Sequence, residues 1–378
     1  MSKYEAPDPD DRPQVSLLTG FLGSGKTTLL NNLVKHPDMG ETAVLINEFG
    51  DIGIDHQLVE QVDENMVLLN SGCLCCTVQG DLERALTELF LKRAQGEIPP
   101  FKRALIETTG LADPAPIIHA LMQDRLISSR YELDAVITTV DAVNGDMQLD
   151  RYKESIKQAA VADRILLTKA DLAKQEDIEQ LVAELRELNP AAPIIHVAHG
   201  RIDPGKLFDV GLYNPETKSL DVQRWLNEEA YLAREKGHRH GHDHDHDHGH
   251  GHHDHDHGEA DAARGQDPHD INRHDEHIRS FSMSFEEPFA WDVLVAWVRR
   301  LIEQHGDDML RVKGIIHLAG QPAPIAIHGV QHLFHDPIPL EDWPDDDKRS
   351  RIVFITRDLD RKTIDDALAE ARKSMSAG

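Results

Sequence analysis

The stretch QVSLLTGFLGSGKTTLL, residues 14–30, sets the fold class of the first part of the chain. It begins as a short apolar run of the kind that forms a buried β-strand, and it ends in a helical pattern. Between the two lies the spacing G-x-x-x-x-G-K-T, formed by Gly20, Gly25, Lys26 and Thr27. A strand, this spacing and a helix in succession are typical of a phosphate-binding P-loop, so the sequence predicts a P-loop nucleotide-binding domain.

The residues of this loop have distinct expected roles in phosphate binding. Its glycines let the backbone curl so that N–H groups point at phosphate, and the helix that follows presents its positive N-terminal end. Lys26 is expected to bring its charge to the β- and γ-phosphates, and Thr27 to offer its hydroxyl to Mg²⁺. The other candidate phosphate-binding residues of the loop are Gly23, Ser24 and Thr28. An ordinary glycine-rich turn would not require the Lys-Thr-Thr run at this place.

The tetrapeptide ETTG, residues 107–110, follows another apolar run. An acid at the end of such a strand can hold Mg²⁺ through water, so Glu107 is a candidate Mg²⁺-binding and catalytic residue. Gly110 could then bring its N–H to the γ-phosphate as a nucleotide sensor. An ordinary strand-to-loop turn is the alternative, but the order of segments along the chain favours the nucleotide site. Together with Lys26, these two residues form the predicted catalytic set.

The tetrapeptide TKAD, residues 168–171, follows the apolar run RILL. It resembles the base-reading sequence Asn-Lys-x-Asp of GTPases, in which the Asp takes both guanine N–H groups and the Lys stem lies over the base. Here Thr168 stands at the Asn position, while Lys169 and Asp171 remain. The segment therefore favours guanine over adenine, and GTP is the predicted nucleotide.

Short β-rich runs alternate with helical patterns from residue 14 to about residue 225. Such alternation is typical of parallel strands joined by helical crossovers, which predicts an α/β fold with a mainly parallel sheet for a domain over 14–225. The expected strands are QVSLLT (14–19), TAVLIN (42–47), RALIE (103–107), DAVITTVD (134–141), RILLT (164–168) and PIIHVA (193–198). Residues 1–13 are expected to form a disordered tail.

A histidine-rich tract interrupts this pattern. The run GHRHGHDHDHDHGHGHHDHDHG, residues 237–258, holds 11 of the 24 histidines and no apolar residue, so it cannot form a packed core. We expect residues 226–277 to be a flexible linker. Imidazole binds Zn²⁺, Co²⁺, Ni²⁺ and Cu²⁺, so the tract is expected to buffer metal ions, and a solubilising spacer is the weaker alternative.

Strand and helix patterns resume near residue 278. Strands are expected at RSFSMSF, MLRVKGIIHLAG, PIAIHGV and RIVFIT, and helices at PFAWDVLVAWVRRLIEQH and KTIDDALAEARKS. These patterns predict a small α+β domain over 278–378. Its scattered histidines, among them His317, His328 and His332, are expected to be ordinary surface or core residues.

Charge and apolar content exclude several functional classes. The formal net charge of −27 argues against nucleic-acid binding, which needs a basic face, and suits cationic partners. No apolar run reaches the length of a membrane span, and the polar start MSKYEAPDPDDRP is unlike a secretory signal. These features predict a cytoplasmic protein whose thiols stay reduced.

All three cysteines, Cys73, Cys75 and Cys76, lie within SGCLCCTV, residues 71–78. Adjacent cysteines are poor disulfide partners, and a tight cluster in a reducing compartment favours metal or redox chemistry. Thiolates select Zn²⁺ or Cu(I) over Mg²⁺. Three of them leave one tetrahedral position open, which suits a site that must release its metal or accept a ligand from a partner. A redox role would be expected of C-x-x-C on a thioredoxin-like unit rather than of C-x-C-C beside a P-loop.

Taken together, the segments GFLGSGKTTLL, NEFGDIGID, SGCLCCTV, ETTGLADP and TKAD resemble the CobW family of metal-trafficking P-loop GTPases, which includes the zinc-regulated GTPase metalloprotein activators. The resemblance covers nearly the whole chain, including a His-rich linker and a CobW C-terminal domain at 278–378. It implies a metallochaperone in which GTP and metal binding are coupled and metal passes to a client metalloprotein. It also implies transported metal at Cys73, Cys75 and Cys76. Glu48 is the candidate fourth ligand by analogy with the family's switch region, and a solvated loop acid is the alternative.

Other interpretations stay open at this point. The cargo could be Co²⁺, for cobalamin synthesis or a nitrile hydratase, because histidine and thiolate also accept that ion. The protein could be a metal store or sensor that does not hydrolyse GTP. A small-molecule kinase would leave the cysteines and the histidine tract unexplained. The C-terminal domain is expected to contact the client or another subunit, so a homo-oligomer is a further option.

Overall fold

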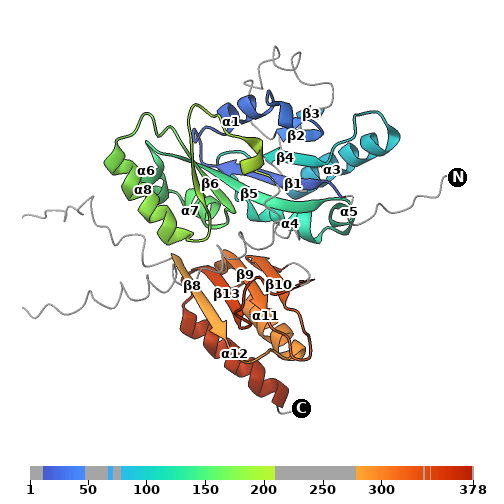
Figure 1. Cartoon of the computed structure of the whole chain (residues 1–378), viewed down its shortest axis with the longest axis vertical. Helices are drawn as coiled ribbons and strands as arrows, with labels where there is room; N and C mark the ends of the chain where they lie inside the picture. Colours follow the sequence, from blue (N-terminus) through green and yellow to red (C-terminus); the bar gives the residue numbers. More distant parts are fainter. Residues whose placement is uncertain are drawn as a thin grey trace, which may run out of the picture.

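A seven-stranded parallel sheet forms the centre of the first domain (Figure 1). The structure, a computed structural model, describes residues 12–46, 67–70, 78–208, 278–334, 337–340 and 342–376. The strands are β1 (Gln14–Gly20), β2 (Thr42–Ile46), β3 (Val67–Asn70), β4 (Arg103–Glu107), β5 (Glu132–Asp141), β6 (Arg164–Thr168) and β7 (Ile194–Val197), in the order β3-β2-β4-β1-β5-β6-β7. Every pair of neighbours in this sheet is parallel, so the predicted α/β fold is confirmed.

Helices cover both faces of this sheet. On one face α1 packs against β1, β2 and β5, and on the other α3, α4, α7 and α8 pack against the strands from β2 to β6. The helices are α1 (Lys26–Leu33), α3 (Val78–Gln95), α4 (Ala115–Gln123), α5 (Arg125–Ser128), α6 (Gly145–Arg151), α7 (Lys153–Ala160) and α8 (Gln175–Leu188). Within the described ranges, no helix has the length and apolar composition needed to cross a membrane.

The sequence predicts six of these seven strands within two residues of their ends and misses β3. β3 has four residues and pairs with a single neighbour, β2, with Val67 opposite Ala43. An apolar run this short gives too little periodicity to distinguish a strand from other structure.

The second domain is an antiparallel sheet with two helices on one face (Figure 1). Its elements are β8 (Ile278–Phe285), α11 (Trp291–His305), β9 (Arg311–Ile316), β10 (Ile325–Val330), β11 (Leu333–Phe334), β12 (Ile338–Pro339), β13 (Ser350–Arg357) and α12 (Arg361–Ser376). The strand order is β11-β10-β9-β13-β8, and β12 pairs with β10. Trp297 of α11 packs edge-on against Phe354 of β13 in the core between helices and sheet. The predicted α+β class of this domain is confirmed.

The helix-free face of the second sheet turns toward the first domain (Figure 1). Ile355 of β13 packs with Ala160 at the end of α7, and Ile315 of β9 packs with Ala191. The Ser280 hydroxyl of β8 donates a hydrogen bond of 2.8 Å to a backbone carbonyl oxygen of α8. The interface therefore mixes small apolar contacts with buried polar ones.

A buried charge cluster joins the two domains at the start of β6. The Asp163 carboxylate accepts hydrogen bonds from Arg311 Nη2 at 2.7 Å and from Lys313 Nζ at 2.5 Å, both on β9. Its other oxygen accepts the Val136 N–H of β5 at 2.9 Å. Burial would raise the pKa of Asp163, but the two cations and these hydrogen bonds hold it well below its ordinary value. The charged carboxylate thus fixes β9 against the middle of β5 and the start of β6.

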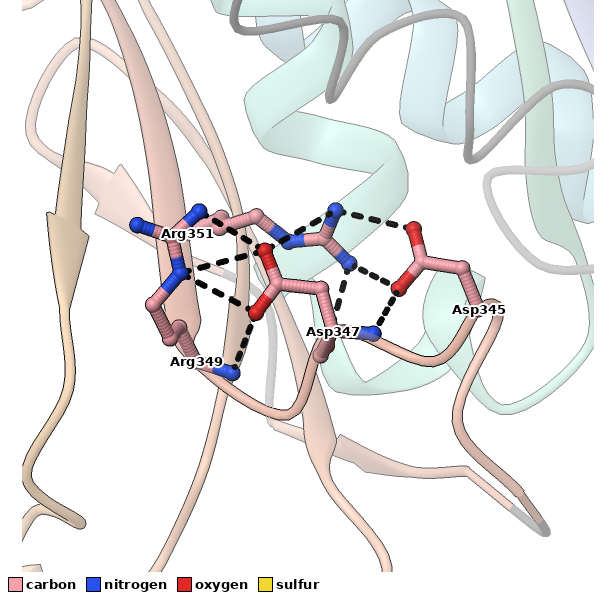
Figure 2. A network of polar contacts seen from close by, with 4 residues as sticks. All are labelled: Asp345, Asp347, Arg349 and Arg351. Atoms are coloured by element: carbon pink, nitrogen blue, oxygen red, sulfur yellow. Dashed lines mark hydrogen bonds and ion pairs between the residues drawn. The ribbon is translucent and has the colours of Figure 1, made fainter.

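A second ion-pair network holds the turn that leads into β13 (Figure 2). The buried side chain of Arg351 donates two hydrogen bonds to Asp345, each of 2.8 Å. Arg349 donates to Asp347 from Nη2 at 2.8 Å and from Nε at 3.0 Å. Paired arginine–carboxylate bonds of this kind fix orientation as well as charge, so the turn is held against the start of the strand.

An acidic cluster between α6 and α8 predicts that stability depends on pH. Glu184 of α8 is half-buried, and burial together with repulsion from Asp146 and Asp150 raises its pKa to about 8. Because this value lies above the usual glutamate pKa of about 4.3, the unfolded chain releases this proton first, and stability falls as pH rises between the two values. Glu184→Gln is therefore expected to raise the melting temperature near pH 8 and to change it little near pH 4. Glu179→Gln, at an exposed position of the same helix, is the control. A shift that is the same at both pH values would contradict this account.

Candidate functional site

The predicted nucleotide-binding segments lie at the carboxyl ends of neighbouring strands in the first sheet. β4, β1, β5 and β6 are adjacent and parallel. The P-loop begins at the last residue of β1, the ETTG segment at the last residue of β4, and the TKAD segment at the last residue of β6. Open α/β sheets bind ligands outside the carboxyl ends of their strands. The three predicted nucleotide-binding segments therefore lie together.

The glycines of the P-loop occupy backbone positions that other residues would not fit. Gly25 precedes α1 in a left-handed conformation with φ of 93°, and Gly23 has φ of 73°. A Cβ at Gly20 would collide with the side chain of Thr139 on β5. Thr28 follows on the first turn of α1 and is exposed.

The Lys26 ammonium lies inside the curl of this loop. Its Nζ donates hydrogen bonds to the carbonyl oxygens of Gly20 at 2.8 Å and Phe21 at 3.1 Å, and the residue is buried. Ser24 is also buried, and its hydroxyl shares a hydrogen bond of 2.6 Å with Thr139. A positive charge and the N-terminus of α1 thus converge, which is a favourable arrangement for binding an anion.

Two oxygen donors meet beside the loop. The Thr27 hydroxyl donates to Glu107 Oε1 at 3.3 Å, although the two residues come from different elements, α1 and β4. The strand pairing that brings them together places Leu18 of β1 opposite Glu107, which is buried. Hydroxyl and carboxylate oxygens are the hard ligands that Mg²⁺ prefers, so these residues fit such an ion.

The Gly110 backbone lies directly against the P-loop. A Cβ at this position would come within 2.6 Å of the Leu22 backbone nitrogen, so glycine is required for the close approach. Gln158 of α7 donates from Nε2 to the carbonyl oxygens of Gly110 at 3.2 Å and Ala112 at 3.0 Å. The predicted sensor segment is therefore tied both to the loop and to a helix.

The TKAD segment is bonded to the P-loop through its first residue. The Thr168 hydroxyl donates to the Ser24 carbonyl oxygen at 2.7 Å. This bond gives a physical role to threonine at a position where the GTPase sequence has asparagine, because the hydroxyl can make the link between the base-reading segment and the phosphate loop.

Asp141, the last residue of β5, is a site residue that the sequence interpretation missed. Its buried carboxylate accepts hydrogen bonds from Lys169 Nζ at 2.7 Å, Asn144 Nδ2 at 2.9 Å and the Val143 N–H at 2.8 Å. Burial would raise the pKa of Asp141, but these bonds and the Lys169 charge lower it below the ordinary value. The sequence signal that could have identified Asp141 is an acidic residue at the end of a predicted strand. Asp141 fixes the side chain of Lys169, whose backbone has an uncommon positive φ of 56°.

His199, in the turn after β7, was also missed. Its Nδ1 lies 3.7 Å from Asp171 Oδ2, and its carbonyl oxygen accepts a hydrogen bond of 3.2 Å from Asn32 Nδ2 of α1. A single histidine in a loop carries no sequence signal for this role. The turn therefore lies beside the predicted base-reading residue Asp171 and contacts α1.

The predicted cargo ligands Cys73, Cys75, Cys76 and Glu48 lie outside the described residues, as does the histidine tract at 237–258. β3 ends at Asn70 and the neighbouring, parallel β2 ends at Ile46, so both strands end on the same side of the sheet as β1 and β4. In the ranges that the structure does describe, no three His, Cys, Asp or Glu side chains are grouped to hold a metal ion.

Comparison with protein families identifies both domains. The model of the CobW/HypB/UreG nucleotide-binding domain matches residues 14–196, and that of the cobalamin synthesis protein CobW C-terminal domain matches residues 278–372. The chain is 32% identical over 359 residues to the zinc chaperone YjiA of Escherichia coli, covering 95% of this chain and 98% of that protein. It is 30% identical over 390 residues to the zinc chaperone CobW of Pseudomonas aeruginosa, covering 94% and 91%.

The similarity to solved structures extends across both domains. The crystal structure of Zn(II)-bound YjiA GTPase from E. coli superimposes with a TM-score of 0.65 at 29% sequence identity, covering 95% of this chain and 99% of that one.

Proposed function

Since the chain belongs to the CobW/HypB/UreG family, we propose that it is a GTP-hydrolysing metallochaperone that binds Zn²⁺ at its C-x-C-C cysteines and transfers it to a client metalloprotein. The observation that carries the nucleotide part is the Lys26 ammonium inside the P-loop, together with the Thr27–Glu107 hydrogen bond beside it, at the carboxyl ends of the strands. The cargo part rests on the three adjacent thiols in the sequence and on relatives named zinc chaperones.

The base-reading end supports GTP as the nucleotide. Asp171 would accept the guanine N–H groups, and the stem of Lys169 would lie along the base. Asp141 would hold Lys169 in place through the 2.7 Å ion pair. Thr168 would keep this end at a fixed distance from the phosphate loop through its bond to Ser24.

The phosphate end supports hydrolysis by electrostatic stabilisation. Lys26 would neutralise charge on the β- and γ-phosphates, and the Gly110 N–H would contact the γ-phosphate. Thr27 and Glu107 would hold Mg²⁺, which supplies further neutralisation of phosphate charge when bound. Preorganised charges and N–H groups account for most of the catalysis in phosphoryl transfer, so this set is sufficient for a slow GTPase.

Coupling between nucleotide and cargo would run through the segments that follow β2 and β3. Both segments begin at the nucleotide edge, and they carry Glu48 and the cysteines. Ordering of these segments by GTP would set the sulfur geometry, and hydrolysis would relax it. Reciprocity then requires Zn²⁺ to change GTP affinity by the same factor by which GTP changes Zn²⁺ affinity.

The remaining parts of the chain would assist this transfer. We place a flexible linker at 226–277, between a nucleotide domain at 14–225 and a C-terminal domain at 278–378. The histidine tract would act as a metal buffer close to the cysteine site. The C-terminal domain would contact the client or a second copy of the chain.

The direct test is Zn²⁺ affinity, measured by competition with a chelating dye in the presence of GTP, GDP or no nucleotide. We expect affinities with GTP and GDP to differ by roughly 5–150-fold, the usual range of such coupling. A variant with Cys73, Cys75 and Cys76 replaced by Ser is expected to lose the nucleotide-dependent binding and to keep the weaker binding of the histidine tract.

Three outcomes would change the proposal. Equal affinities in all nucleotide states would contradict the coupling. Absence of GTP turnover would leave a metal store. Co²⁺ binding tighter than the Irving–Williams trend allows would indicate a cobalt client instead.

A further inference from the structure

Two histidines from different domains face each other across the interface. His119 lies on α4 of the first domain, and His332 lies in the turn between β10 and β11 of the second. Their ring centroids are 6.0 Å apart, and the ring planes make an angle of 57°. We propose that His119 and His332 form a two-histidine site for a divalent transition-metal ion, separate from the cysteine site, which bridges the two domains.

The separation of the rings suits one shared ion. Zn–N bonds are about 2.0–2.1 Å long, so two imidazoles on one tetrahedral ion have ring centroids about 5 Å apart, and the rings need to approach each other by only about 1 Å. The tilt between the planes is also compatible with two rings that approach an ion from different directions. Small side-chain rotations would therefore bring one nitrogen of each ring onto the same ion.

Ordered elements hold the backbone at both histidines. His119 is flanked on α4 by Ile118 and Ala120, which are buried in the core. His332 lies against Gly306, where an added Cβ would come within 2.7 Å of the His332 Cβ. Gln331, the other turn residue, donates its N–H to the Met309 carbonyl oxygen at 2.7 Å. With both backbones fixed, binding an ion orders only the two side chains, which costs less conformational entropy than ordering two mobile segments would.

The charges around the pair favour a cation. Asp307 Oδ1 lies 3.7 Å from His332 Nδ1, and Glu83 of α3 acts electrostatically on His119. Burial and the neighbouring His332 lower the pKa of His119, which favours the neutral ring that binds metals. Imidazole suits Zn²⁺, Ni²⁺ and Cu²⁺, whereas Mg²⁺ and Ca²⁺ prefer oxygen ligands. Water, or the exposed Asp307 carboxylate, would complete the coordination.

An ion bound by this pair would connect the two domains. α4 begins at Ala115, a few residues after Gly110 of the predicted sensor segment, and His332 lies in the turn between two strands of the sheet that packs on the first domain. A bound ion would tie α4 to the second domain and stabilise the pairing of the domains. This inference does not depend on GTP hydrolysis or on the cysteine site.

The test is residue-resolved histidine footprinting on the full-length chain. The protein is labelled with diethyl pyrocarbonate in solutions of buffered free Zn²⁺, and mass spectrometry gives the labelling rate of each histidine. Buffering fixes the free ion concentration although the histidine tract also binds. We expect the rates for His119 and His332 to fall together, roughly tenfold or more at free Zn²⁺ well above the dissociation constant, because only the ion-free fraction reacts.

Single variants separate a shared ion from other effects. His332→Gln is expected to abolish protection of His119, and His119→Gln that of His332, while His317→Gln changes neither. Melting curves check that each variant is folded. Protection of His119 that survives in His332→Gln, or no protection of either ring at millimolar free Zn²⁺, would overturn the proposal. Protection in the triple cysteine-to-serine variant is expected to be unchanged, so failure of the cargo proposal and failure of this one are distinguishable.

Discussion

Lys26→Met is expected to lower the rate of GTP hydrolysis by about a hundredfold or more, the usual loss when one preorganised charge-stabilising donor is removed. Methionine keeps the unbranched stem but cannot place a positive charge beside the phosphates. The ammonium lies inside the loop, bonded to the Gly20 and Phe21 carbonyl oxygens, so no other side chain of the P-loop can substitute for it. Steady-state phosphate release under saturating GTP and Mg²⁺ measures the effect.

Lys35→Met is the matched control for this variant. Lys35 follows α1 at an exposed position, and its replacement removes the same charge away from the loop. We expect its hydrolysis rate to stay near that of the unmodified protein. A Lys26→Met protein that is folded by circular dichroism and hydrolyses GTP at the control rate would exclude the P-loop as the catalytic centre.

The sequence alone was sufficient to predict those parts of the fold that depend on local sequence patterns. Most strands of the first sheet and the loop around Lys26 could be predicted because hydrophobic period and glycine spacing act within about twenty residues. The strand β3 was not predicted, because four residues are too few to show the alternation of a strand. β3 is also held in the sheet by its pairing with β2, and a single sequence does not reveal that pairing.

The contacts that the sequence could not predict are those between distant segments. Asp141 ends a predicted strand, but its partner Lys169 is recognisable only when β5 and β6 are known to be adjacent. Asp163 and Arg311 are 148 residues apart and meet only because the second sheet packs on the first domain. His332 was expected to be an ordinary residue of its domain, since nothing near it in the sequence indicates His119.

Asp163→Ala is expected to reduce the free energy of unfolding by about 3–5 kcal/mol, because it removes the carboxylate that the buried Arg311 and the largely buried Lys313 share across the interface. Arg311 and Lys313 have side chains only 6% and 16% exposed, so water cannot replace the lost carboxylate. Because the pKa of Asp163 is depressed in the fold, its contribution is present above the unfolded value of about 3.9 and is lost as pH falls below it. The difference between the two proteins should therefore shrink in acid. Urea unfolding followed by tryptophan fluorescence, to which the buried Trp297 contributes, measures it.

A triple variant distinguishes unpaired charge from lost packing at this interface. Asp163→Leu, Arg311→Met and Lys313→Met together remove all three charges at similar volume, and such replacements are often neutral or stabilising. We expect this protein to recover most of the stability that Asp163→Ala loses, whereas Asp366→Asn, at an exposed ion pair on α12, should change little. If the triple variant were as unstable as Asp163→Ala, the cluster would stabilise the domain pairing through its specific hydrogen bonds, and the loss could not be attributed to stranded charge.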